Sequence, residues 1–290
     1  MSGVPSAGAR PRLSGHLPWV GAASGVTSGL LGVGGAIVLV PLMTRVLRLS
    51  QHRAHGTSLA VVLFTATAAF LGYLRTGNVD ILATLPLVAG SVVGSPLGAR
   101  WAHATPAAAL RRAFGVLLLA VSVRMFLPQL PAGQLLPDQG LAALAARVAL
   151  GGVTGVLSGF FGVGGGVVLV PALVLLAGVP QHVAQGISLL FIVPTAAAGA
   201  WAHHKLGNVE RSVVLPLALW SMGGAFAAAL VAASIPAAAL RVLFGVFLAV
   251  MGLRMVFGRR RAAAGPATAV PAAPAAEPPA PPAPPAPPEG

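Results

Sequence analysis

The sequence predicts an all-α polytopic membrane protein made of two inverted repeats, each a broken, glycine-tipped helical hairpin followed by three transmembrane helices. Composition, eight long apolar runs and an internal duplication carry this prediction. Of the 290 residues, 56% are hydrophobic and 8% are charged, whereas an average soluble domain has roughly 25% charged residues. The mean hydropathy is +0.87, which excludes an ordinary water-soluble globule.

The charged residues are strongly unbalanced, with 18 Lys and Arg against five Asp and Glu and a formal net charge of +13. Such basic chains often bind nucleic acid, but here the bases stand singly between apolar runs, so we expect no nucleic-acid partner. With no cysteine, the chain lacks disulfides and thiol nucleophiles, and we expect no cofactor. No acid lies inside an apolar run; the acids are Asp80, Asp138, Glu210, Glu277 and Glu289.

Apolar runs divide the chain into segments. A spanning helix needs about 20 mostly apolar residues, and eight runs stand out at 17–47, 54–74, 81–102, 105–127, 147–177, 184–204, 212–233 and 235–257. The predicted segments are an N-terminal tail at 1–16, a membrane repeat at 17–127, a linker at 128–146, a second membrane repeat at 147–258 and a tail at 259–290. The last segment is rich in Pro and Ala, so we expect it to be disordered.

The duplication appears when the chain is shifted by 130 residues without a gap. GVTSGLLGVGGAIVLVP at 25–41 then lies over GVLSGFFGVGGGVVLVP at 155–171, with 12 of 17 positions identical. QHRAHGTSL at 51–59 lies over QHVAQGISL at 181–189, with six of nine identical. Agreement over both segments indicates that the chain consists of two copies of one unit.

The distribution of Lys and Arg favours repeats of opposite orientation. If the first long run of each repeat is a hairpin that returns to its own side, Lys and Arg divide 14 to 4 between the two sides, against 11 to 7 if every run crosses once. The positive-inside rule then predicts inverted repeats with both termini cytoplasmic. Hairpin arms at 17–31, 36–47, 147–161 and 166–177 would each be about 18–22 Å long, short of a ~30 Å hydrocarbon core. One long kinked helix in each run is the alternative.

The predicted hairpin tips are the first place to look for a binding site. They read Gly32-Val33-Gly34-Gly35 in the first repeat and GVGGG at 162–166 in the second. Glycine permits the positive φ values of a sharp reversal, and the second arm starts there with unpaired amides and the positive end of its dipole. Broken helices near the midplane are the usual transporter binding site. The alternative is close helix packing, our interpretation of Gly90, Gly94 and Gly98.

These motifs resemble the TauE/SafE family of sulfite exporters. The resemblance rests on the duplicated G-x-G-G-[AG] runs that end in Pro41 and Pro171 and on the Q-H-x-A-x-G-x-S-L run after each, and it covers about 17–257. It implies transport, most simply export, of sulfite, organosulfonates or related small sulfur-containing anions across the bacterial inner membrane. The first tip departs from the second, because Ala36 stands where the second repeat has Gly166.

The residues themselves also suit an anion, because helix N-termini favour negative charge and no membrane-embedded carboxylate opposes it. Hydroxyl and amide groups near the tips can donate hydrogen bonds to an oxyanion; packing between helices is the alternative role for the Ser and Thr residues, and an interfacial role for the His residues. The candidate substrate-binding residues are Ser28, Gly32, Gly34, Gly35, Gln51, His52, His55, Ser58, Thr65, Ser158, Gly162, Gly164, Gly165, Gly166, Gln181, His182, Gln185, Ser188 and Thr195.

The function that these observations predict is transport rather than catalysis. Paired carboxylates, a Cys/His metal spacing and a P-loop lysine are all missing from the sequence, so we expect neither an enzyme nor a bound metal. Expected partners are the small anion and the lipid bilayer, with a homodimer left open. The alternatives are a passive anion channel, a metal-cation permease that uses the histidines, and a scaffold whose proline-rich tail recruits a cytoplasmic partner.

Overall fold

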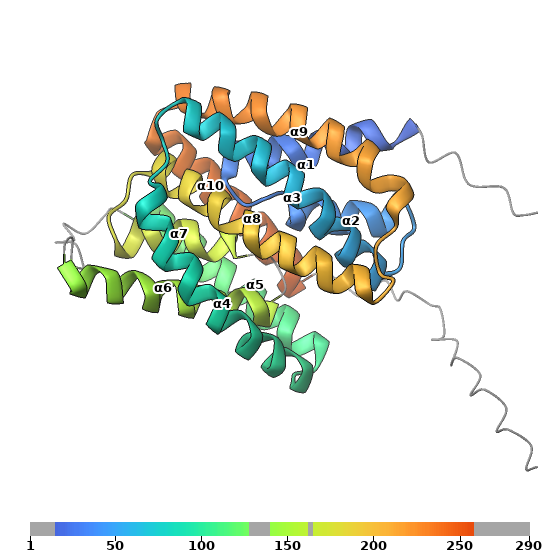
Figure 1. Cartoon of the computed structure of the whole chain (residues 1–290), viewed down its shortest axis with the longest axis horizontal. Coiled ribbons are helices and arrows are strands. Elements are labelled where there is room, and N and C mark those ends of the chain that lie inside the picture. The colour runs from blue at the N-terminus through green and yellow to red at the C-terminus, as the bar shows by residue number, and fades with distance from the viewer. Residues whose placement is uncertain (1–14, 128–139, 162–164, 258–290) are drawn as a thin grey trace, which may run out of the picture. The chain divides into compact units, whose positions relative to one another are not determined.

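The computed structural model describes residues 15–127, 140–161 and 165–257, and all regular structure in these ranges is α-helical (Figure 1). Helices suit a chain of this composition, because lipid offers no partner for backbone N–H and C=O groups and a helix pairs them internally. The helices are α1 (Leu17–Leu31), α2 (Ala36–Arg45), α3 (Gln51–Arg75), α4 (Ile81–Ala104), α5 (Ala107–Phe126), α6 (Gly140–Phe161), α7 (Gly166–Leu176), α8 (Gln181–Lys205), α9 (Arg211–Ser234) and α10 (Ala237–Phe257).

Six helices of the described ranges are long and apolar enough to cross a membrane, namely α3, α4, α6, α8, α9 and α10. The number agrees with the six crossings that the sequence predicts, but the helices differ. We expected α5 to cross, yet its 20 residues carry Arg111, Arg112 and Arg124. We expected the first arm of the second hairpin to start at 147, whereas α6 begins at Gly140 and is 22 residues long. Part of the predicted linker is therefore helical.

The first long run is broken at its glycines, as the hairpin prediction requires. Gly32, Gly34 and Gly35 all have positive φ, at 69°, 74° and 74°, a region that L-residues with a side chain rarely adopt. The chain reverses there, because the Ser24 hydroxyl donates to the carbonyl of Gly35, eleven residues later, at 3.3 Å. In a continuous helix these residues would lie about 16 Å apart, so a single long helix is excluded for this run.

Equivalent helices of the two repeats pack against each other as an antiparallel pair. Gly56 near the start of α3 contacts the backbone of Asn208, just past the end of α8. Gly186 near the start of α8 contacts the backbone of Asn78, just past the end of α3. Each contact becomes the other when the numbering is shifted by 130. Helices α3 and α8 therefore run in opposite directions and exchange equivalent contacts.

Glycine also brings helices of different repeats into backbone contact. Gly90, Gly94 and Gly98 on α4 face the carbonyl oxygens of Val148, Gly152 and Val156 on α6, closer than any side chain would allow. Figure 1 shows α4 beside α6 and α9 beside α1, where Gly25 meets Ser221 in the same way. The close-packing interpretation of Gly90, Gly94 and Gly98 is thus confirmed.

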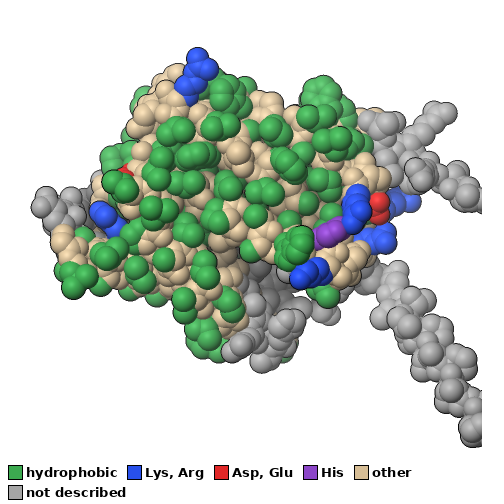
Figure 2. Space-filling model, in the orientation of Figure 1, with side chains coloured by type: hydrophobic (Ala, Val, Ile, Leu, Met, Phe, Trp, Pro, Cys, Tyr) green, Lys and Arg blue, Asp and Glu red, His purple; other side chains and the backbone are tan. Residues whose placement is uncertain are grey.

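The outer surface is consistent with a lipid environment. Large apolar side chains such as Leu82, Val93 and Leu215 are more than half exposed, and Figure 2 shows hydrophobic side chains spread over the visible face with few charges among them. The described residues up to Val256 form one compact unit. The predicted tails at 1–16 and 259–290 lie almost wholly outside the described residues.

Candidate functional site

The first tip joins the end of α1 to the start of α2. The Gly32 amide donates to the carbonyl of Ser28 at 2.8 Å, which ends α1 with a left-handed glycine. Gly35 precedes α2, and no side chain caps that helix start. Because the first amides of a helix have no partner within it, the start of α2 presents donors and the positive end of its dipole to the tip.

Helix α8 of the second repeat holds this tip from the side. The Ser188 hydroxyl donates to the carbonyl of Gly32 at 2.8 Å, and the Gln185 amide donates to the carbonyl of Leu30 at 3.1 Å. Carbonyls in the last turn of a helix have no partner within it, so these side chains satisfy the end of α1. Two predicted site residues are therefore brought to the first tip, across a sequence distance of about 155 residues.

A third side chain, not predicted from the sequence, completes this contact. The Tyr73 hydroxyl lies 2.7 Å from Oε1 of Gln185 and 3.0 Å from the carbonyl of Gly29, and its side chain is fully buried. Tyr73 is the only tyrosine in the chain. A single phenol inside an apolar helix was the available signal, since a buried Tyr hydroxyl usually has a partner.

The start of α7 in the second repeat lies against the first tip. A methyl group on Gly166 would lie 3.1 Å from the carbonyl oxygen of Gly32 and 2.7 Å from the Ser188 hydroxyl. One on Gly34 would lie 3.2 Å from both Val62 of α3 and Ile192 of α8, which occupy equivalent positions of the repeats. Gly162 and Gly164 lie outside the described residues.

The repeats differ in sequence at the positions of Gln185 and Tyr73, where the other repeat has histidines. His55 and His203 occupy the positions equivalent to Gln185 and Tyr73, and both are partly buried. The Cβ of His203 would lie 2.9 Å from a methyl group on Gly56, so His203 packs against the start of α3. The hydroxyl of Ser158 lies 3.3 Å from where Gly165 would carry a methyl group, so it faces the second tip.

Two predicted residues, one on α1 and one at the start of α8, have buried polar atoms that are not hydrogen-bonded to any described residue. They are the hydroxyl of Ser28 and both the amide nitrogen and oxygen of Gln181. Gln181 is 3% exposed and lies one turn before Gln185 on α8. Because an unpaired buried polar group costs about 1–3 kcal/mol, a small polar ligand would be stabilised here by the Ser28 hydroxyl and the Gln181 amide nitrogen, which can donate hydrogen bonds, and by the Gln181 amide oxygen, which can only accept one.

The other predicted residues lie elsewhere or use their hydroxyls locally. His182 places Nε2 at 3.2 and 3.0 Å from the carbonyls of Ala232 and Ile235 at the end of α9, away from the tips. The hydroxyls of Thr65 and Thr195 donate to their own helices. Ser58 is buried in α3, and the side chains of Gln51 and His52 lie outside the described residues.

A metal site is not evident in the described ranges, where no three His, Cys, Asp or Glu side chains gather. The chemistry that the first tip offers is hydrogen-bond donation from amides, hydroxyls and a carboxamide. Such donors suit an oxyanion rather than a metal cation, which needs oxygen, nitrogen or sulfur lone pairs.

Comparison with known proteins identifies a family whose model covers most of the chain. The family model described as "Sulfite exporter TauE/SafE" matches residues 3–125 and 147–287, and its gap falls between the two repeats. No solved structure matches this chain.

Curated relatives carry the names of transporters. The probable membrane transporter protein YdhB of Bacillus subtilis is 28% identical over 237 residues, which cover 80% of this chain and 96% of the relative. The probable membrane transporter protein YunE of the same organism is 27% identical over 262 residues, covering 82% and 95%. A probable membrane transporter protein, MJ0441, of Methanocaldococcus jannaschii is 26% identical over 252 residues, covering 82% and 93%.

Proposed function

Because the chain belongs to the TauE/SafE sulfite exporter family of membrane transporters, we propose that it moves a small sulfur oxyanion, such as sulfite or an organosulfonate, out of a bacterial cell. The observation that carries the proposal is the set of donors at the first tip. The start of α2 contributes backbone amides, and the buried hydroxyl of Ser28 has no partner among the described residues. The buried carboxamide of Gln181, one turn before Gln185 on α8, likewise has no such partner.

Charge supports an anion as the substrate. Each acid of the chain lies outside the apolar runs, so none would repel a negative ligand inside the membrane. Sulfite and sulfonates present several acceptor oxygens on one small centre, and hydrogen bonds to charged groups are worth about 1.5–3 kcal/mol each. A few convergent donors therefore suffice for selective but reversible binding.

We place the tips near the bilayer midplane between inverted repeats, with both termini cytoplasmic. The antiparallel contact of α3 and α8, which are equivalent helices, supports this orientation, because spanning helices with that relation put their repeats in opposite directions. Alternating access would then be a rocking of one group of helices against the other around the tips. A homodimer is compatible with this mechanism but is not required by it.

Flux into proteoliposomes tests the proposal directly. We expect sulfite or one of the sulfonates taurine and sulfoacetate to enter with saturable kinetics, and chloride to enter more slowly. Gln181→Leu removes the buried carboxamide at similar volume and should abolish most of the flux. Ser122→Ala is a control, because the Ser122 hydroxyl binds the Gly245 carbonyl on another helix pair.

Two outcomes would contradict the proposal that the protein is an anion transporter. Flux of sulfite that rises linearly with concentration and resembles that of chloride would indicate a passive anion channel. Saturable uptake of nickel or cobalt without any anion flux would indicate a metal-cation permease. If a Gln181→Leu variant were as active as wild type, Gln181 would not belong to the binding site, although the transport activity itself would be unaffected.

A further inference from the structure

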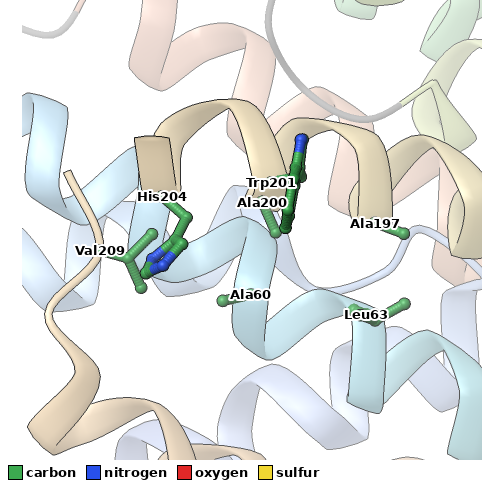
Figure 3. A pocket seen from close by; sticks show the side chains of 7 residues that line it. All are labelled: Ala60, Leu63, Ala197, Ala200, Trp201, His204 and Val209. Carbon is green, nitrogen blue, oxygen red and sulfur yellow. The ribbon is translucent and has the colours of Figure 1, made fainter. Parts of the chain in front are cut away.

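A groove of about 280 Å³ runs between α3 and α8 near the end of α8 (Figure 3). Ala60 and Leu63 line one side, and Ala197, Ala200, Trp201 and His204 line the other. The groove opens to the surface, and Trp201 beside it is 62% exposed. The helices around it are membrane-spanning candidates by length and composition, so in a bilayer this groove would face lipid.

Cations surround the polar end of the groove. Lys205 places its ammonium 5.0 Å from the centre of the Trp201 ring. Arg211 places Nη2 2.7 Å from Nε2 of His204, and Arg53 pairs with Glu210 at 3.1 Å. Figure 2 shows Lys, Arg, His and acidic side chains gathered at one end of the visible face, next to hydrophobic surface. Three cations against one carboxylate leave this end positive.

These arginines retain the capacity to bind an anion. A guanidinium has five N–H donors, so the single contacts of Arg53 and Arg211 leave most of them available. Lys205 is exposed. The positive end and the apolar groove are adjacent, because His204 and Trp201 line the groove and also contact Arg211 and Lys205.

The duplicated half of the chain provides an internal comparison. Leu190 and Phe70 stand where the groove has Ala60 and Ala200, so larger side chains occupy these two positions, whereas the smaller Val193 and Leu71 stand where it has Leu63 and Trp201. The positive end is also weaker there, since Ile81 is equivalent to Arg211 and Val183 to Arg53. The two alanines of the groove and the added cations thus occur together in one half of the duplicated chain.

We propose that this groove is a binding site for one anionic phospholipid. A stretch of one acyl chain lies on the alanines between α3 and α8, and the phosphate contacts Arg211 and Lys205. Trp201 lies between them, where amphipathic indole rings concentrate at the membrane interface. A cavity of about 280 Å³ is too small for a whole lipid, and it therefore suits part of one chain. This site is separate from the glycine tips and does not depend on the transported anion.

Native mass spectrometry of the detergent-purified full chain tests the acyl-chain contact. With equal amounts of phosphatidylglycerol and phosphatidylcholine, we expect one retained phosphatidylglycerol per chain and at least a fivefold preference for it. Ala200→Phe fills the groove and should reduce that retention at least fivefold. Ala198→Phe is the matched control, because Ala198 is exposed on the same helix and does not line the groove.

The headgroup contact is tested by removing charge. Arg211→Gln and Lys205→Gln should each weaken phosphatidylglycerol binding about fivefold, the usual contribution of one basic residue near an anionic lipid surface. Arg75→Gln removes the residue equivalent to Lys205 in the other half and should leave binding unchanged. Thermal unfolding of each variant checks that the fold is retained.

Several results would overturn the proposal. They are equal retention of the two lipids, equal effects of Ala200→Phe and Ala198→Phe, or equal effects of Lys205→Gln and Arg75→Gln. Displacement of phosphatidylglycerol by millimolar inorganic phosphate would also overturn it, because a simple anion site has no need of the groove. Sulfite flux that persists in Ala200→Phe would separate this site from the transport function.

Discussion

The Tyr73 hydroxyl lies 2.7 Å from Oε1 of Gln185, although 112 positions of sequence separate the two residues. The contact joins the end of α3 in the first repeat to the start of α8 in the second, and both side chains are fully buried. Through Gly29 and Leu30 the same pair holds the end of α1. The first glycine tip is therefore positioned by the other repeat as well as by its own.

Removing the Tyr73 hydroxyl should destabilise the protein. Tyr73→Phe leaves Oε1 of Gln185 and the carbonyl of Gly29 without this donor, at a cost of about 1–3 kcal/mol. We expect a lower midpoint of thermal unfolding in detergent. Thr67→Val is the control, because the Thr67 hydroxyl binds only its own helix, at the carbonyl of Leu63. Equal midpoints for Tyr73→Phe and wild type would show that this hydrogen bond does not stabilise the fold.

Two serines near the first tip should separate structure from binding. Ser188→Ala removes the donor to Gly32 and should lower the unfolding midpoint. Ser28→Ala removes a hydroxyl that has no partner among the described residues, so stability should change little. If Ser28 binds the anion, the loss of about 1.5–3 kcal/mol raises KM for flux at least tenfold. An unchanged KM in Ser28→Ala would remove this residue from the site.

The close contact between the start of α7 and the first tip should leave no room for a side chain at Gly166. Gly166→Ala puts a methyl group against the Ser188 hydroxyl and the carbonyl of Gly32, and we expect sulfite flux to fall at least tenfold. Gly223→Ala is the matched control on α9, because a methyl group there meets nothing within 4 Å. That change should keep full flux and stabilise the helix by up to about 1 kcal/mol. Full flux in Gly166→Ala would refute the close contact.

Proton sensitivity is expected at His55 and His203. Histidine changes its charge between about pH 5 and 8, and His55 and His203 stand in sequence where the other repeat has Gln185 and Tyr73, which stay neutral over that range. His55→Gln makes this position match the other repeat, so we expect flux to lose most of its pH dependence over that range. His16→Gln changes an exposed histidine before α1 and should preserve the profile. Identical profiles for His55→Gln and wild type would place proton sensitivity elsewhere.

Much of the fold follows from local pattern. The breaks at Gly32–Gly35 and the helical runs require only glycine conformation and apolar length, so they are predictable without tertiary contacts. The limits of the helices and the choice of spanning helices were predicted less well. Helix α6 starts at Gly140, before the predicted 147, and α5 is not among the spanning candidates. Helix limits in a chain of almost uniform hydropathy have weak signals, which explains these two differences.

Part of the candidate site is likewise predictable from the sequence, and part depends on tertiary packing. Composition, the shift of 130 residues and the glycine motifs are enough to identify a duplicated membrane protein with paired tips and an interior without carboxylates. Only the packing of the helices determines that Ser188 contacts Gly32, that Tyr73 contacts Gln185 and that His182 lies at the end of α9. The physical reason is that a helix apolar on all sides has no sequence stripe to mark its buried face. Which polar side chains meet therefore depends on how the helices are rotated against one another.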